Sequence, residues 1–337
     1  MPDVNRRLLL AERPSGMVDA SVVRQDDAPV PEPGPGEALV RVRYLSIDPT
    51  IRTWMDDAPG YLPPIGIGEV IRGAGIGEIV SSNSPRHQKG DLVFGMLGWQ
   101  DYVIADPEAD GGALQTLPPG VEPALALNLF GVNGMTAYFG LLDVGALEEG
   151  DTVVISGAAG ATGSAVGQIA KLKGAGKVVG LAGTDEKCRW IVDQLGFDEA
   201  INYKTEPVGP RLRAACPEGI DLYFDNVGGE ILDTCLGLLA RRGRVVLCGA
   251  ISTYNQPGRP AGPGNYRALI GRRGRMEGFI ILDYAARFGE AQAVMLGWLA
   301  EGKLRHAEHI VDGLASAPDA LNLLFTGGNI GKVIVAL

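Results

Sequence analysis

A glycine-rich turn between a strand-like and a helix-like segment is the strongest chemical signal in this 337-residue sequence. Residues 153–167 read VVISGAAGATGSAVG, so a β-branched run leads into small residues and then into a helical pattern. This context is typical of dinucleotide-binding sites, because a helix N-terminus offers N–H groups and a positive dipole end to a pyrophosphate. The spacing is A-x-G-x-x-G: Ala158 takes the first glycine position, Gly160 admits the phosphates and Gly163 lets the helix pack on the strand. A tight turn that is rich in small residues for packing alone is the other interpretation.

The end of the next strand favours a phosphorylated cofactor. It carries Gly183 and Thr184, where an NAD site usually has Asp or Glu for the ribose hydroxyls, a group that would repel a 2′-phosphate. Lys187 follows at the start of a helix and could meet that phosphate, which favours NADP over NAD; a plain surface lysine is the alternative. Asp185 and Glu186 would oppose a phosphate if they faced it, but we expect them to complement the helix dipole.

A tyrosine follows the fourth strand-like run of this region. Residues 244–248 lead into GAISTYN at residues 249–255, and the carboxyl ends of parallel strands form the ligand crevice of such a sheet. A phenol at that place can donate to a substrate oxygen that gains negative charge. Tyr254 is therefore the candidate catalytic residue, with an uninvolved loop tyrosine as the alternative.

The elements that must position these residues fall into two segments. In the first ~120 residues, short alternating runs at 38–44, 75–80 and 101–105 are separated by Pro/Gly turns, which predicts a barrel-like β domain. From residue 152 onward, β-branched runs alternate with helical ones, which predicts an α/β fold with a doubly wound parallel sheet. The expected strands are 152–156, 177–181, 220–225 and 244–248, the expected helices are 164–173, 185–195, 230–240 and 291–301, and a last strand at 331–337 is expected to return to the first domain.

Composition excludes several classes of protein. With 30 Lys and Arg against 40 Asp and Glu, the net charge of −10 would repel a phosphate backbone, so we expect no nucleic-acid partner. The long apolar stretch 125–147 contains Asn, Thr, Asp and glycines, so we expect it inside the protein and expect no membrane span. The cysteines lack C-x-x-C spacing, which favours free thiols in a reducing cytoplasm: Cys188, Cys216, Cys235 and Cys248.

Several motifs recur in one known group in the order found here. They are IDP (47–49), GVNGMTAY (131–138), EKC (186–188), NYK (202–204), YFDNVGG (223–229), CGAISTYN (248–255) and GGNIGK (327–332). They cover essentially the whole chain. The sequence resembles the zinc-independent medium-chain dehydrogenase/reductases of the prostaglandin reductase, leukotriene hydroxydehydrogenase and alkenal double-bond reductase group, to which bacterial curcumin-reductase-type enzymes belong. The resemblance implies a GroES-like β-barrel domain at 1–125, completed by 300–337, and a Rossmann NADP-binding domain at 126–299.

The resemblance also implies roles for individual residues. The phosphate loop is Ala161, Thr162, Gly163 and Ser164 beside Gly160, and the 2′-phosphate contacts are Lys187 and Tyr203. The nicotinamide side is lined by Asn226, Cys248, Gly249, Ala250, Ile251, Ser252, Thr253, Phe279, Ile280, Ile281 and Asn329. Tyr254 matches the tyrosine that holds the enolate oxygen in this group.

The substrate side departs from the pattern of the group. Relatives commonly carry Asp-Pro-Tyr-Met-Arg where this sequence has DPTIR at 48–52. Thr50 removes an aromatic hydroxyl from the expected substrate pocket, and Trp54 or Tyr61 are the candidates to fill the space. Zinc-dependent relatives take ligands from a Cys and a Gly-His-Glu stretch of the first domain. The first domain here has no cysteine, and residues 66–70 read GIGEV, so we expect no metal.

These expectations combine into an NADPH-dependent reductase of the α,β-double bond of enones or enals. Hydride transfer to the β-carbon would leave an enolate that Tyr254 stabilises, and the partners would be a small substrate and, by family analogy, a second copy in a homodimer. Three alternatives stay open: a quinone reductase of the same superfamily, a non-catalytic NADPH-binding redox sensor, and a zinc alcohol dehydrogenase. NADPH consumption with enals, enones and quinones distinguishes the first two from the proposal.

Overall fold

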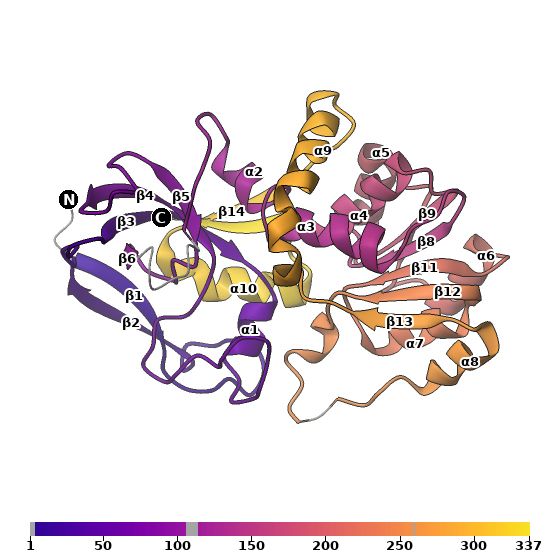
Figure 1. Ribbon diagram of the computed structural model, residues 1–337. Coiled ribbons are helices and arrows are strands. Elements are labelled where there is room, and N and C mark those ends of the chain that lie inside the picture. Colours follow the sequence, from indigo (N-terminus) through magenta and orange to yellow (C-terminus); the bar gives the residue numbers. More distant parts are fainter. Residues whose placement is uncertain (1–3, 106–113, 259) are drawn as a thin grey trace. The chain divides into compact units, whose positions relative to one another are not determined.

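The computed structural model describes residues 4–105, 114–258 and 260–337 (Figure 1). The chain divides into two compact units, one formed by residues 1–127, 308–329 and 333–337 and the other by 128–307 and 330–332. Residues 300–307, which the sequence assigns to the first domain, lie in the second unit. Gln168 holds them there, because its Nε2 donates to the carbonyl of Arg305 at 2.9 Å and its Oε1 accepts from the Arg305 N–H at 2.8 Å.

The first unit is built on a largely antiparallel sheet around a buried apolar core. Its strands follow the order β14 (Glu308–Asp312), β15 (Lys332–Ala336), β3 (Ala38–Ile47), β4 (Gly75–Ser82), β5 (Leu92–Gly95) and β7 (Gln115–Thr116), while β6 (Tyr102–Ala105) pairs with β3. A separate hairpin joins β1 (Val4–Leu10) to β2 (Val23–Pro29), and the helices are α1 (Thr50–Trp54), α2 (Pro123–Leu127) and α10 (Ala317–Thr326). Val335 of β15 lies opposite Leu45 of β3, which confirms that the last strand returns to the first unit.

The second unit contains a parallel sheet with the order β10 (Glu199–Asn202), β9 (Lys177–Ala182), β8 (Thr152–Ser156), β11 (Ile220–Asp225), β12 (Leu239–Leu247) and β13 (Arg275–Gly278). The direction of winding reverses between β8 and β11, and ligands bind outside the carboxyl ends of strands at such a reversal point. Both predicted domain architectures, GroES-like and Rossmann, are confirmed.

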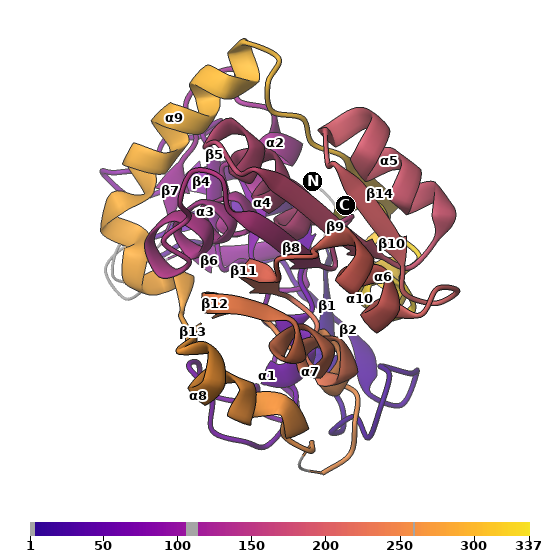
Figure 2. The ribbon, with the colours of Figure 1, turned by 90° about the vertical axis from the view of Figure 1, so that its right-hand side faces the viewer.

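Helices cover both faces of this parallel sheet (Figure 2). Val179 of β9 packs in one core cluster with Leu212 of α6 (Val208–Ala215) and Leu236 of α7 (Gly229–Gly237). The next residue, Gly180, faces Ile191 of α5 (Asp185–Leu195). Because successive side chains of a strand point to opposite faces, the helices lie on both sides. The remaining α-helices in the described part of the unit are α3 (Val132–Phe139), α4 (Ala161–Leu172), α8 (Ala268–Arg272) and α9 (Phe288–Ala300), with a π-helical turn η1 (Gly140–Val144) after α3.

The predicted boundary between the helix 230–240 and the strand 244–248 is wrong. The sequence predicts a helix over 230–240, but α7 ends at Gly237 and β12 begins at Leu239. Leu239 lies opposite Ile220 in the sheet, and the Ile220 N–H donates to the carbonyl of Leu238 at 3.0 Å. Pairing with β11 therefore overrides the helical preference of Leu and Ala.

The apolar stretch 125–147 is divided among short elements. It contributes to α2, α3 and η1, with residues 128–131 between the two α-helices. Among the described residues, none of the helices has the length and apolar character that crossing a membrane requires.

Candidate active site

The glycine turn joins β8 to α4 in a conformation that needs its glycines. Gly157 has a φ of 59°, and a Cβ atom at Gly163 would lie 2.4 Å from the Gly157 carbonyl oxygen. Gly160 is the N-cap of α4 and has no side chain to cap it. The first N–H groups of any helix lack intrahelical acceptors, so this turn presents bare N–H groups to an anion.

The alanine at the first glycine position is accommodated by the neighbouring strand. Ala158 is fully buried, and a Cβ atom at Gly180 of β9 would lie only 2.9 Å from the Cβ of Ala158. The methyl group of Ala158 therefore fits because Gly180 of β9 has no side chain. Gly180 is a residue that sequence reasoning missed, although a glycine inside a β-branched run signals close packing.

A second strand of backbone braces the same turn. Gly331 forms a parallel bridge with Gly160, and the Gly331 N–H donates to the carbonyl of Ala159 at 2.8 Å. Gly331 has a φ of 68°, and a Cβ atom there would lie 2.0 Å from the carbonyl oxygen of Ala307. The predicted nicotinamide residue Asn329 comes two positions earlier and is buried in the first unit.

Two side chains of the predicted phosphate loop have internal partners. The Ser164 hydroxyl donates to the carbonyl of Ala161 at 3.1 Å, and Ser164 is buried. The Thr162 hydroxyl accepts from the side-chain amide of Asn133 at 3.4 Å. The backbone N–H groups at the start of α4 are thus the donors of this loop that remain to bind an anion.

The predicted 2′-phosphate residues gather at the carboxyl ends of β9 and β10. A Cβ atom at Gly183 would lie 2.9 Å from the Tyr203 hydroxyl oxygen, so the phenol rests on the backbone that follows β9. Thr184 caps α5 by accepting the N–H of Lys187 at 3.2 Å. Burial lowers the pKa of Lys187 and raises that of Tyr203, and the ammonium group of Lys204 lowers the Lys187 pKa further. Positive charge concentrated beside a phenol fits a phosphate dianion.

Tyr254 and Asn226 meet at the carboxyl ends of β11 and β12. A Cβ atom at Gly249 would lie 3.3 Å from the Tyr254 hydroxyl oxygen and equally far from the Asn226 carbonyl oxygen. The Tyr254 oxygen accepts the N–H of Ala250 at 3.1 Å. The phenol is the acceptor in this bond. The loop 248–254 is also tied to the next turn, since the Ser252 hydroxyl donates to the carbonyl of Val227 at 2.6 Å.

A buried carboxylate fixes the orientation of Asn226. Asp225 Oδ1 accepts from the Tyr223 hydroxyl at 2.7 Å, the Ser156 hydroxyl at 3.0 Å and the N–H groups of Val227 and Gly228 at 3.0 and 2.9 Å. Ser156 in turn accepts the Asn226 N–H at 2.9 Å on Oγ and the Asn226 side-chain amide at 2.7 Å on its carbonyl. The amide nitrogen of Asn226 is therefore held at β8, which leaves its Oδ1 as an acceptor.

The buried carboxylate also affects the thiol next along the sheet. Burial and the nearby Asp225 raise the pKa of Cys248 to about 12, so this predicted cofactor residue stays a neutral thiol at physiological pH. Its backbone N–H donates to the carbonyl of Asp225 at 2.9 Å. Sequence reasoning missed both Asp225 and Ser156 as residues of the site, although Asp225 lies in the YFDNVGG motif.

The segment 279–281 follows β13 and is held by aromatic contacts. A Cβ atom at Gly140, the first residue of η1, would lie 2.7 Å from Cζ of Phe279 and 2.9 Å from Cε2 of Phe224. Phe279 also contacts Tyr284 edge to face, with ring centroids 6.3 Å apart. These contacts fix the backbone at 279–281, the part predicted to face a carboxamide.

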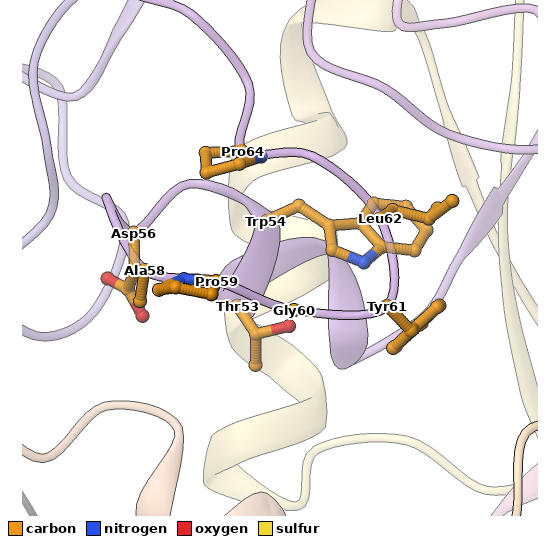
Figure 3. A pocket seen from close by; sticks show the side chains of 9 residues that line it. All are labelled: Thr53, Trp54, Asp56, Ala58, Pro59, Gly60, Tyr61, Leu62 and Pro64. Atoms are coloured by element: carbon orange, nitrogen blue, oxygen red, sulfur yellow. The ribbon is translucent and has the colours of Figure 1, made fainter.

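The predicted substrate residues of the first unit lie together. The Thr50 hydroxyl and the Tyr61 hydroxyl are 2.8 Å apart, and the rings of Tyr61 and Trp54 meet edge to face at 6.2 Å. Of these residues, Trp54 and Tyr61 line a cavity of about 150 Å³ (Figure 3). Trp54 Nε1 is buried and has no hydrogen-bond partner within the described part of the chain. The cavity is lined by Thr53, Trp54, Asp56, Ala58, Pro59, Gly60, Tyr61, Leu62 and Pro64.

Comparison with known proteins matches both units. Residues 6–110 match the family described as N-terminal domain of oxidoreductase, and residues 161–300 match the family described as zinc-binding dehydrogenase. In the residues that the structure describes, no group of three or more His, Cys, Asp or Glu side chains is arranged to hold a metal ion.

Individual relatives extend over nearly the whole chain. The NADPH-dependent curcumin reductase of Escherichia coli (strain K12) is 43% identical over 336 residues, covering 98% of this chain and 96% of the relative. The NADP(+)-dependent 2-alkenal reductase of Nicotiana tabacum is 41% identical, covering 91% and 88%. The crystal structure of CurA in complex with NADPH from Vibrio vulnificus is 43% identical, covers 98% of each chain and superposes with a TM-score of 0.93. The chain belongs to the zinc-independent medium-chain dehydrogenase/reductases, in the group of the prostaglandin, curcumin and alkenal double-bond reductases.

Proposed function

We propose that this chain is an NADPH-dependent oxidoreductase that reduces the α,β-double bond of enones and enals. The observation that carries the proposal is the convergence of Asn226, Gly249 and the Tyr254 hydroxyl at the carboxyl ends of β11 and β12. The glycine turn that follows β8 lies across the reversal point of the same sheet. Relatives named as NADPH-dependent reductases of curcumin and 2-alkenals support the assignment.

NADP(H) is the cofactor that the second unit fits. The backbone of Gly160–Gly163 would hold the pyrophosphate, Lys187 and Tyr203 the 2′-phosphate, and Asn226 with the backbone of 248–253 and 279–281 the nicotinamide end. Ser164 would support the loop through its bond to Ala161. When bound, the reduced cofactor supplies the hydride that the β-carbon of the substrate receives.

Tyr254 is the proposed catalytic residue. As charge moves onto the carbonyl oxygen of the substrate, the phenol O–H donates to that oxygen and stabilises the enolate. The Ala250 N–H, which donates to the phenol oxygen, orients the hydroxyl. Solvent then protonates the α-carbon. A fixed donor of this kind acts only where charge develops, so it lowers the barrier more than it tightens substrate binding.

The first unit is proposed to contribute substrate contacts through Thr50, Trp54 and Tyr61. Thr50 replaces an aromatic residue, and its hydroxyl instead holds the hydroxyl of Tyr61 at the rim of the cavity. The unpartnered Trp54 Nε1 is a further donor for a polar group of the substrate. Tyr61 thereby returns an aromatic hydroxyl to this region from a different position in the sequence.

Replacing Thr50 with valine is expected to raise KM for enones about fivefold, because Tyr61 loses the partner that holds its hydroxyl. Tyr61→Phe removes the other half of the same bond. The double variant should therefore resemble the Tyr61→Phe variant rather than double its effect. Steady-state kinetics with an enone series measures this, and the KM for NADPH serves as the internal control. Unchanged KM values for every enone would remove both residues from the substrate site.

A homodimer joined along β13 is also proposed. β13 is the last strand of the parallel sheet, so its outer edge offers backbone groups to another strand. In β13, Arg275 precedes Met276 and Glu277 follows it. Antiparallel pairing of two copies about a twofold axis at Met276 would therefore place each Arg275 opposite Glu277 of the second copy. Ile270 in the preceding helix α8 is 77% exposed. We expect sedimentation to give twice the mass of one chain and Met276→Pro to give monomers.

A cytoplasmic location is proposed from the thiols. All four cysteines are free, and burial raises the pKa of Cys216 to about 11. Thiols in this state are typical of a reducing compartment. Alkylation of every free thiol in denatured cell extract, followed by reduction and a second label, would reveal any disulfide and contradict this location.

The decisive experiment follows NADPH absorbance with saturating enal, enone or quinone, and repeats each assay with NADH. We expect turnover with the enal and the enone, preference for NADPH, and a product reduced at the carbon–carbon bond by mass spectrometry and NMR. Turnover with the quinone alone would instead identify a quinone reductase. Tight NADPH binding without turnover of any substrate would identify a non-catalytic sensor.

A further inference from the structure

The turn that follows β10 brings a second lysine to the predicted 2′-phosphate site. A Cβ atom at Gly183 would lie 2.9 Å from the Tyr203 hydroxyl oxygen and 3.3 Å from Cε of Lys204. Tyr203 and Lys204 therefore lie side by side over the backbone that follows β9. Lys204 directly follows Tyr203, for which the resemblance implies a contact with the 2′-phosphate. Neither the motif nor the spacing gives Lys204 itself a role.

An acidic residue close to this site binds a side-chain amide. Asp185, the first residue of α5, accepts the side-chain amide of Asn202 at 2.6 Å. Asn202 is buried, and its Oδ1 accepts the Lys204 N–H at 3.1 Å. One side chain thus binds both the carboxylate and the backbone of the lysine turn.

The second acidic residue near the turn also has other partners. Glu206 accepts the Asn202 N–H at 2.9 Å and pairs with Arg211 at 2.7 Å. The Asp185 carboxylate is therefore bound by Asn202, and the Glu206 carboxylate is bound by Asn202 and Arg211. Exposed Glu186 is close enough to Lys187 to raise its pKa, but burial and Lys204 outweigh it, and the net effect is a lowered pKa. The ammonium groups of Lys187 and Lys204 are close enough to repel each other, and a bound phosphate dianion would offset this repulsion.

We propose that Asn202 and Lys204 determine the preference for a 2′-phosphate, Lys204 as a direct contact and Asn202 as a positioning residue that holds Asp185 away from it. This inference rests on the proposed function, since it concerns the NADP(H) site. A carboxylate shortly after the second strand is what an NAD site uses for the ribose hydroxyls. The chain retains such a carboxylate at Asp185, and the amide of Asn202 engages it, so that the site accepts a phosphate beside an acidic residue.

The first test measures binding of two nucleotides that differ only in the 2′-phosphate. Isothermal titration compares adenosine 2′,5′-bisphosphate with adenosine 5′-monophosphate on the full chain. Lys204→Met should weaken binding of the bisphosphate about tenfold and change binding of the monophosphate less than about twofold, because one charge-assisted hydrogen bond is lost. Lys204→Arg should restore most of the affinity. The matched control is Lys303→Met, an exposed lysine paired with Glu301, which should change neither affinity.

The second test separates charge from structure at Asn202. Asn202→Ala releases the Asp185 carboxylate and should weaken bisphosphate binding about tenfold, whereas Asp185→Asn alone should bind it at least as well as the parent chain. The double variant should recover the affinity that Asn202→Ala loses, because the freed group is then neutral. The ratio of kcat/KM for NADPH to that for NADH should follow the same order among the variants.

Several outcomes would overturn the inference. Equal weakening of both nucleotides by Lys204→Met would make this lysine a structural residue. A double variant as weak as Asn202→Ala, or an Asp185→Asn variant that is itself weak, would show that charge on Asp185 is not what Asn202 controls. These binding measurements need no substrate. If enone reduction fails while the parent chain distinguishes the two nucleotides, the proposed activity is wrong and the inference stands. If the parent chain does not distinguish them, the NADP site itself is wrong.

Discussion

Replacing Tyr254 with phenylalanine is expected to lower kcat for enones by about a hundredfold or more, because one fixed donor to a developing oxyanion contributes ~3–4 kcal/mol. Affinity for NADPH should stay within about threefold, since the ring remains and one neutral hydrogen bond contributes little net binding energy. Stopped-flow mixing of the enzyme–NADPH complex with saturating enone measures the hydride step directly. Fluorescence titration measures NADPH binding in the same preparation.

The control for this substitution is a tyrosine of the same unit that is remote from the strand ends. Tyr266 is 56% exposed, and Tyr266→Phe should leave kcat unchanged. Phenylalanine at 254 also leaves the Ala250 N–H without its acceptor, so a displaced loop could mimic a catalytic loss. A displaced loop would weaken NADPH binding as well. An unchanged kcat would remove Tyr254 from the mechanism.

Replacing Asp225 with alanine is expected to destabilise the second unit by about 4 kcal/mol, because four donors, three of them buried, lose their shared acceptor at once. Those donors are the hydroxyls of Tyr223 and Ser156 and the N–H groups of Val227 and Gly228. For a unit of this size the thermal midpoint should fall by about 10 °C. Differential scanning calorimetry and urea unfolding followed by circular dichroism measure the change.

Tyr223→Phe is the matched control for this prediction. It removes one donor and leaves the carboxylate with three, so it should cost about 1 kcal/mol. If Asp225→Ala were no more destabilising than Tyr223→Phe, the carboxylate would not organise the turn. Asp225→Ala should also weaken NADPH binding, because Asn226 depends on Ser156 and Asp225 for its orientation.

Much of the fold follows from local patterns in the sequence. The helix expected at 185–195 has the same bounds as α5, and Thr184 caps it in the structure. β13 escapes prediction because it has only four residues, Arg275–Gly278, two of them charged and one of them glycine. Such a strand exists through its pairing with β12 rather than through its own preference.

The site divides along similar lines. Candidate site residues at strand ends could be predicted directly from the sequence, as Tyr254 and the glycine turn illustrate. Pairings between distant residues could not, because they depend on register: Ser156 and Asp225 are 69 positions apart and meet because β8 and β11 are neighbours. The bonds from Thr50 to Tyr61 and from Asn202 to Asp185 likewise join residues whose separate motifs give no sign of contact.

The passage of residues 330–332 through the second unit has a consequence for biosynthesis. β15, which lies between β14 and β3, is translated after nearly the whole second unit, and the brace on the glycine turn comes just before it. On the ribosome, the first unit must wait with an incomplete sheet until its last strand emerges. A fragment cut at residue 127 or 307 would lack a strand or a brace. Neither half should be recoverable as a well-folded piece by simple truncation.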